Sequence, residues 1–453
     1  MATSAIPATA TETFRLRISL AASWYMVILL SATNAVAFID RQALPLLVQQ
    51  IEKDLHLTDT QMSIVIGAAF VVAWAVLGLF AGVLVDRVNR KVTMAVGACI
   101  WGVMTISCGW ATSFTTLCLG RMGVGIGESI AGPGSVSLIK DGVEPNGRGR
   151  ALGIYALGAS IGAALALLGG GALLALLKDV EEVRLPVLGV MRSWQVVLAA
   201  SGLLAFPLAG LLLTMRDPGR SARATDRRSF GGIGEAFGYV VTHWRVFLPT
   251  FIANGATIIL VVSYQLWQPT LFARLWHLSR PEIGLGLGLI TLLLSTTSQF
   301  CAGAVIDSLE RRGVNRAPAM VGLGAAIAAL LPAIFAPLAP TATLAWILAA
   351  LYAFLTTGFF TTGLAVVARL TPSRLVGRVA SFHYFWVGMI GTGLGPAIIA
   401  LVSDHLYSGP GAISPSMSTV SGLFDVVALL CFGWLMMTWP RPVTVLAASA
   451  DLA

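Results

Sequence analysis

The sequence predicts an all-α polytopic membrane protein with twelve transmembrane helices in two pseudo-symmetric six-helix bundles. Of its 453 residues, 57% are hydrophobic and 11% are charged, and the mean hydropathy is +0.83. A soluble chain carries roughly a quarter of its residues charged. The apolar residues form repeated runs of the length, about 20 residues, that crosses a hydrocarbon core. A short charged motif follows the second apolar run of each half, which indicates a duplication.

Each predicted helix is an apolar run that ends at polar, glycine or proline residues. The polar stretch after the sixth run is rich in proline, glycine and charge, as expected of a linker, and an interfacial helix is expected at 230–243. The predicted helices are 21–46, 60–85, 92–112, 115–139, 149–177 and 192–215, then 246–273, 282–306, 317–337, 342–368, 376–402 and 418–439. The predicted organisation is an N-terminal tail (1–20), a first bundle (21–215), a linker (216–245), a second bundle (246–440) and a C-terminal tail (441–453).

The placement of basic residues predicts the orientation in the membrane. Alternate loops, beginning with residues 86–91, hold about three times as many Lys and Arg as the opposite loops. The positive-inside rule therefore places the first set of loops, the linker and both tails in the cytoplasm. The expected location is the cell membrane, which in a bacterium is the inner membrane. Because the net charge of +8 is concentrated in these loops, we expect the lipid bilayer, and no nucleic acid, as the partner of the basic residues.

The charged motif of the first half runs from Gly82 to Lys91. Where the helix leaves the membrane, its acid can cap the next helix or hold an arginine across the loop, and its basic residues lie beside anionic lipid. A weaker copy begins at Gly303 in the second half. We predict that the two loops form a conformational latch made by Gly82, Asp86, Arg87, Arg90, Lys91, Asp307 and Arg311.

Four ionisable residues fall inside predicted helices of the first half: Asp40 and Arg41 in the first helix, and Arg121 and Glu128 in the fourth. Each costs about 2.5–3.5 kcal/mol or more at a helix centre, so each should face a partner or water. Arg121 and Glu128 are seven residues apart, hence on one helix face and about 10 Å from each other. We predict an acid–base network across these helices that binds substrate or couples protons. The alternative is a buried salt-bridge lock with no direct role in transport.

The second half offers polar and aromatic side chains in place of paired charges. Asp425 is its clear intramembrane acid, and the sequence leaves open whether it lies near enough to the surface to be solvated. His383 can titrate near neutrality or serve as a packing residue. A charged first half and a polar second half favour an amphipathic substrate whose anionic head meets Arg41 or Arg121. The cavity candidates are Asn254, Tyr264, Gln268, Thr357, Thr361 and His383.

The stretch from Gly82 to Lys91 resembles the G-x-L-x-D-R-x-G-R-K motif of the major facilitator superfamily, with Asn89 in place of the second glycine. Asn tolerates a left-handed backbone, so the turn can be kept. The run Arg121-x-Gly123-x-Gly125-x-Gly127 resembles the helix-4 motif of the same family. The resemblance implies the major facilitator fold and alternating access, in which two halves expose a central site to one side at a time.

Within that superfamily, the sequence resembles the Spinster group. The stretches that carry this likeness are Phe38-Ile-Asp40-Arg41, Gly123 to Glu128, Trp267-Gln-Pro269-Thr, Ile390 to Pro396 and Leu401-Val-Ser-Asp404. The resemblance implies lysophospholipid or sphingosine-phosphate substrates and coupling to protons. It also implies that Asp40 and Glu128 are proton-sensitive and that Arg41 contacts the head group.

Two other functions remain open from the sequence. One is a proton-coupled symporter or exporter of small organic anions or drugs. The other is a membrane-embedded enzyme or sensor, but the sequence has no HExxH, P-loop or metal-ligand motif. Its GxSxG match, Gly158 to Gly162, falls inside the predicted membrane helix 149–177 and not at a turn between a strand and a helix. The five cysteines lie in apolar runs without a CxxC pair, as buried small hydrophobes do. We therefore expect no enzyme activity, no catalytic residue, no metal and no cofactor apart from protons as a coupling ion, in a monomer.

Overall fold

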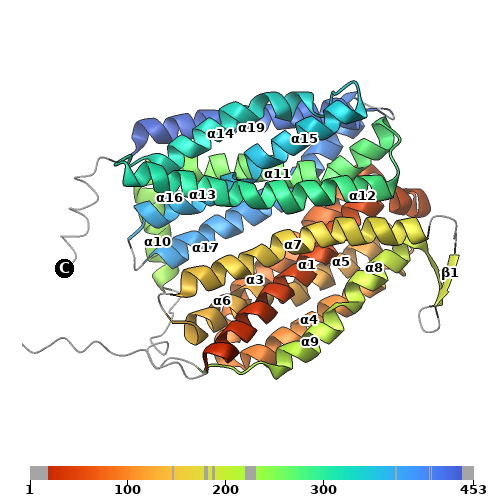
Figure 1. Ribbon diagram of the computed structural model, residues 1–453, viewed down its shortest axis with the longest axis horizontal. Helices are drawn as coiled ribbons and strands as arrows, with labels where there is room; N and C mark the ends of the chain where they lie inside the picture. Colours follow the sequence, from red (N-terminus) through yellow and green to blue (C-terminus); the bar gives the residue numbers. More distant parts are fainter. Residues whose placement is uncertain are drawn as a thin grey trace, which may run out of the picture.

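Two helical bundles lie side by side in the computed structural model of the protein, with the first half below and the second half above in Figure 1. The structure describes residues 19–144, 147–177, 182–185, 189–219, 231–372, 375–407, 409 and 411–440. Within these ranges, the side chains of 79–87, 149, 185, 189, 231–233, 360 and 377 are outside the description. Residues 1–18 of the predicted N-terminal tail, residues 220–230 of the linker and the predicted C-terminal tail also lie outside the described residues.

The first bundle contains six helical segments that follow the predicted spans closely. Its long N-terminal helix begins at a serine cap, where the Ser19 hydroxyl accepts from the Ala22 amide, and ends at His56 in a left-handed conformation. The segments are α1 (Leu20–Leu55); α2, η1 and α3 (Asp59–Ser63, Ile64–Ala68, Ala69–Arg87); α4 (Arg90–Cys108); α5 and α6 (Phe114–Glu128, Ala131–Gly142); α7 (Arg148–Leu176); and α8 and α9 (Ser193–Leu203, Ala205–Thr214).

The second bundle has the same number of segments, preceded by a short helix at the place where an interfacial helix is expected. That helix is α10 (Gly231–Thr242). The segments are α11 (Trp244–Leu275); α12, η4 and α13 (Arg280–Leu289, Ile290–Ser295, Thr296–Arg311); α14 (Ala317–Phe335); α15 and α16 (Ala342–Thr357, Phe359–Leu370); α17, η5, α18 and η6 (Val376–Val387, Gly388–Leu394, Gly395–Val402, Ser403–Tyr407); and α19 (Ile413–Thr438).

Among the described residues, 11 helices are long and apolar enough to cross a membrane. The predicted helix 115–139 is not one of them, because its place is taken by two shorter helices, α5 with 15 residues and α6 with 12. The break at Ser129–Ile130 follows three glycines and the acid Glu128, which weaken a continuous apolar helix. With α5 and α6 counted as one segment, the chain has the predicted twelve-segment, two-bundle fold.

A β-hairpin is the exception to the all-α expectation. Strands β1 (Glu182–Leu185) and β2 (Gly189–Arg192) pair antiparallel, with Val183 opposite Met191. The hairpin stands at one end of the bundles, opposite the end that carries α10 (Figure 1). We call these the hairpin end and the linker end.

The interface between the bundles, which we call the seam, is made by three pairs of segments: α7 with α12, α1 with α11, and the π-helical turns η1 with η5. Glycines allow the backbones to approach closely. A Cβ on Gly67 of η1 would lie 2.5 Å from the carbonyl oxygen of Thr392 in η5, and one on Gly284 of α12 would lie 2.4 Å from the carbonyl oxygen of Leu167 in α7. At the hairpin end, the apolar core crosses the seam and joins Leu47 of α1 to Trp267 of α11.

Candidate functional site

The α5 helix carries two of the four intramembrane charges and packs tightly against its neighbours. It begins at a capping box in which the Ser113 hydroxyl accepts from the Thr116 amide. Glycines then allow close contact: a Cβ on Gly125 would lie 2.4 Å from the Phe70 carbonyl oxygen, and one on Gly127 would lie 2.6 Å from the Trp101 amide nitrogen. The glycine motif of the sequence therefore positions α5 against α3 and α4 and fixes the depth of its charged residues.

The four charged residues meet as two ion pairs between α1 and α5. Arg121 Nη1 donates to Asp40 Oδ2 at 3.0 Å. Arg41 Nε donates to Glu128 Oε2 at 2.8 Å, and its Nη2 donates to the same oxygen. Neighbouring residues of α1 thus pair with residues one heptad apart on α5. This arrangement also settles which arginine holds which acid.

The two pairs differ in exposure and in how well they are satisfied. Asp40, Arg121 and Glu128 are each 1% exposed, whereas the side chain of Arg41 is 27% exposed. Both carboxylate oxygens of Asp40 have partners, since Ser201 Oγ donates to Oδ1 at 3.4 Å. Glu128 Oε1 has no partner among the described residues. Arg41 and Glu128 therefore form the pair that an incoming group can reach and rearrange.

Aromatic rings surround the arginines. The guanidinium carbon of Arg41 lies 4.6 Å from the ring centre of Phe70, 5.1 Å from that of Phe38 and 5.7 Å from that of Trp74. Such faces attract a guanidinium electrostatically and add apolar surface around it. Trp74 also lies at the seam, 3.5 Å from the position that a Cβ on Gly388 of η5 would take. The Arg41 site thus combines a cation with an aromatic wall next to the second bundle.

The six cavity candidates of the second half are spread over four helices. Tyr264 stacks on Tyr352 with ring centres 4.3 Å apart, and the Asn254 amide donates to the Thr250 carbonyl oxygen at 2.8 Å. His383 is fully buried beside the Phe251 ring. No hydrogen bond among the described residues joins any two of the six. The others lie as follows: Gln268 is buried in α11, the Thr357 hydroxyl donates to the Ala353 carbonyl oxygen, and Thr361 lies near Gly303.

At the hairpin end, polar contacts join the two bundles across the seam. The sequence did not indicate these contacts. Arg274 of α11 holds both oxygens of Asp59 at 2.7 Å and Glu52 Oε2 at 2.8 Å. Thr60 Oγ1 donates to Asp404 Oδ2 at 2.5 Å. In the sequence these charges lie at the edges of loops, where they are indistinguishable from ordinary solvated residues. We call the group of Arg274, Glu52 and Asp59 the hairpin-end clamp.

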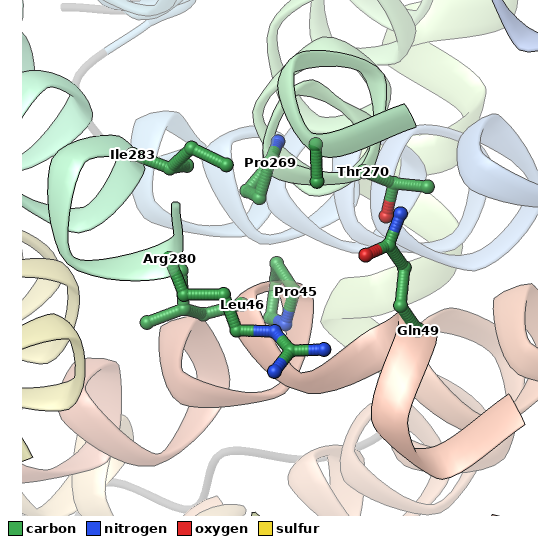
Figure 2. A pocket seen from close by; sticks show the side chains of 8 residues that line it. Pro45, Leu46, Gln49, Pro269, Thr270, Arg280 and Ile283 are labelled. Atoms are coloured by element: carbon green, nitrogen blue, oxygen red, sulfur yellow. The ribbon is translucent and has the colours of Figure 1, made fainter. Parts of the chain in front are cut away.

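The seam beside this clamp is closed to anything larger than water. The side chains of Pro45, Leu46 and Gln49 face those of Pro269, Thr270 and Arg280, as Figure 2 shows. The void between them has a volume of about 10 Å³, which is room for at most one water molecule.

At the linker end, two residues of the predicted latch bind within their own bundle. Arg90 is buried and donates to Asp141 at 2.6 Å and, through Nε, to Asp217 Oδ2 at 3.2 Å. Lys91 Nζ donates to the Leu213 carbonyl oxygen at 2.9 Å. These bonds hold α4, α6 and the chain after α9 together.

Of the other predicted latch residues, only Asp307 and Arg311 have described side chains. Asp307 and Arg311 are exposed, and neither has an ion pair among the described residues. The side chains of Asp86 and Arg87, like Gly82, fall in the stretch 79–87, outside the described side chains. The latch therefore stays a prediction.

Two helical bundles, joined by a seam and carrying paired charges at membrane depth, define a multi-pass membrane transporter. The model of the Major Facilitator Superfamily matches residues 30–396. The chain belongs to this family and is a secondary transporter, not an enzyme.

Relatives and solved structures agree with this assignment. The chain is 24% identical to an MFS-type efflux pump of Mycolicibacterium smegmatis, over 91% of this chain and 92% of that protein. It is also 24% identical to the hexuronate transporter of Escherichia coli (strain K12), over 58% of this chain and 60% of that one. Its fold is similar to the crystal structure of a bacterial homologue of the human lysosomal transporter Spinster in an inward-facing, occupied conformation. That match has a TM-score of 0.74 and 22% identity, and covers 96% of this chain and 98% of that one.

Proposed function

We propose that the protein moves an amphipathic anion, such as a lysophospholipid or a sphingolipid-like molecule, across the cell membrane by proton-coupled alternating access. The fold supports the alternating-access part, since two bundles meet at one seam. Both bundles come from one chain, so the working unit that we propose is a monomer.

The conformation that we assign to the structure is inward-facing. The clamp, the Thr60–Asp404 hydrogen bond and the apolar core all join the bundles at the hairpin end. Basic residues are concentrated at the opposite end, which the positive-inside rule places in the cytoplasm. The hairpin end is then the closed outer side. The Spinster homologue, whose fold is similar, was also captured inward-facing.

The observation that carries the substrate proposal is the partly exposed Arg41, paired with a fully buried Glu128. A phosphate or carboxylate head can take the place of Glu128 as the partner of Arg41, because arginine binds either group through two parallel hydrogen bonds. The displaced Glu128 would then be a buried, unpaired carboxylate, which is costly. Protonation of Glu128 removes that cost. Anion binding at Arg41 and proton binding at Glu128 therefore favour each other.

The aromatic faces of Phe38, Phe70 and Trp74 supply the apolar side of this site. They suit a substrate with a non-polar body attached to the anionic head. A second candidate keeps the mechanism and changes the cargo to a small organic anion or drug. The similarity to a hexuronate transporter and to an efflux pump supports that candidate.

The test is uptake into proteoliposomes of a labelled lysophospholipid and, in parallel, of a labelled hexuronate, with and without an imposed pH gradient. We expect lysophospholipid uptake that follows the gradient, is lost in Arg41→Ala, and depends less steeply on pH in Glu128→Gln. Arg192→Ala is the matched control, because Arg192 pairs with Asp54 at 2.5 Å within the first bundle. If only hexuronate is taken up, the substrate is a small organic anion and not a lysophospholipid. A pH dependence as steep in Glu128→Gln as in the wild type would refute the coupling role of this residue.

A further inference from the structure

Asp425 of α19 is buried without a counter-charge. Its exposed fraction is 0%, so the structure excludes the solvated position that the sequence left open. Neither of its carboxylate oxygens has a hydrogen-bond partner or an ion pair among the described residues. The transport mechanism proposed above makes no use of this group.

The elements packed against Asp425 offer it no cation. Helix α19 packs on α11, α14, α18 and η6. Neither α14 nor α18 contains a titratable side chain. The charged groups of α11 are Arg245 and Arg274, at its two ends, and Arg274 is held by the clamp. In η6, the titratable side chains of Asp404, His405 and Tyr407 are exposed.

Tyr352 of α15 is the neighbour that interacts electrostatically with Asp425. It is 2% exposed, and its ring lies 4.3 Å from that of Tyr264 of α11. Its hydroxyl makes no hydrogen bond to the carboxyl group, since both oxygens of Asp425 lack partners among the described residues. A phenol therefore lies near Asp425, and no described cation pairs with it.

A carboxylate in such a place is unfavourable. The desolvation penalty of one unpaired ion in a protein interior is several kcal/mol even after relaxation. A neutral carboxylic acid avoids most of that cost. A metal cation is a poor alternative, because hard cations need about six to eight oxygen ligands, and no group of three acidic, His or Cys side chains occurs in the described part of the chain.

We propose that Asp425 is a second proton-binding site, in the second bundle, occupied in the conformation described here. Its link to transport rests on the proposed function. The Tyr352 ring lies against the Tyr264 ring, with the centres 4.3 Å apart. The residue after Tyr264, Gln265, lies 3.5 Å from Gln42 of α1. Gln42 follows Arg41 in the chain. Separation of α1 from α11 changes the surroundings of Tyr264, and this motion gives Asp425 a route to lose its proton when the outer side opens.

The first test is infrared spectroscopy of the purified wild-type protein at neutral pH, labelled with ¹³C-aspartate. We expect a carbonyl stretch of a protonated carboxyl group that shifts with the label, is absent in Asp425→Asn, and persists in Asp404→Asn and Glu128→Gln. Asp404 is the matched control because it is an exposed acid that binds Thr60. A spectrum without an aspartate-derived band, or a band that persists in Asp425→Asn, would overturn the proposal.

The second test separates this site from the Glu128 site. Asn has the shape of Asp and no charge, so we expect Asp425→Asn to fold and keep the wild-type melting temperature, and to carry one proton fewer per transported substrate. A folded Asp425→Asn that still carries the wild-type number of protons per substrate would overturn the link of this site to transport. The infrared measurement does not require transport. Its result therefore tests the protonation of Asp425 even if the proposed substrate or the proposed coupling by Glu128 is wrong.

Discussion

Replacing Arg274 with alanine should open the hairpin end of the transporter, which we propose to be its outer side. Arg274 belongs to the second bundle, and its two acidic partners belong to the first. The clamp exists only while the hairpin ends are together, so its loss raises the energy of the closed state alone. It also leaves Glu52 and Asp59 close together without their shared cation.

The size of this effect follows from the burial of the clamp. Removing one partner of a fully buried pair costs about 3–5 kcal/mol, and exposed pairs contribute about 0–1 kcal/mol. The side chain of Arg274 is 25% exposed, and those of Glu52 and Asp59 are 10% and 12% exposed. A value of about 2 kcal/mol lies between these limits. Since 1.4 kcal/mol is a factor of ten, the fraction of molecules open at the hairpin end should rise about 30-fold.

The assay is the reaction of Thr270→Cys with a membrane-impermeant maleimide added outside cells, in a chain without native cysteines. Thr270 is 2% exposed and lines the closed seam (Figure 2), so its rate of labelling reports the open fraction. Arg192→Ala and Arg280→Ala are controls. Arg192 pairs within the first bundle, and Arg280 lies at the seam without an ion pair among the described residues. An unchanged rate in Arg274→Ala, or an equal increase in a control, would refute the reasoning.

Three further predictions concern packing and stability. Gly67→Ala should speed the same labelling reaction, because its Cβ would lie 2.5 Å from the η5 backbone. Gly78→Ala is the control and should leave the rate unchanged, since no atom lies within 4 Å of its Cβ. Equal labelling rates in the two variants would contradict the role of η1. Arg90→Ala should lower the stability by about 3 kcal/mol, as measured by the melting temperature, because it removes the buried cation that binds Asp141 and Asp217. Lys91→Ala, which loses hydrogen bonds to carbonyl groups, should change the melting temperature less. Ser201→Ala should lower the stability by under about 1 kcal/mol and leave uptake unchanged, because the hydrogen bond from Ser201 to Asp40 is long, at 3.4 Å. A large loss of uptake in this variant would show that the bond matters.

The sequence predicted the fold and the charged cluster because both follow from the cost of the membrane interior. Apolar runs must span the bilayer as helices, and Asp40, Arg41, Arg121 and Glu128 must find partners there. The heptad spacing of Arg121 and Glu128 was enough to place them on one face. Their pairing could not be read from this spacing, because it depends on how α1 rotates against α5.

Other features were missed because they depend on contacts between distant segments. Arg274 lies in the last turn of its helix, where a charge is usual, so nothing in the sequence indicated that it crosses the seam. Burial of Asp425 depends on the packing of α19 against α11 and α14, which are distant from it in the chain. The break between α5 and α6 was also missed, because the apolar character of the run continues across it.

The π-helical turns at the seam have a consequence for the faces of their helices. A π-turn contains one residue more than an α-helix needs to make the same turn. The helix after the π-turn is therefore rotated about its axis by about 100°, which is the angle between successive residues of an α-helix. In the segment from α2 to α3, the helix face that packs on the second bundle is therefore formed by a different set of sequence positions before η1 than after it. Deleting one residue in η1 would restore a continuous helix, and it would also turn Trp74 away from Arg41.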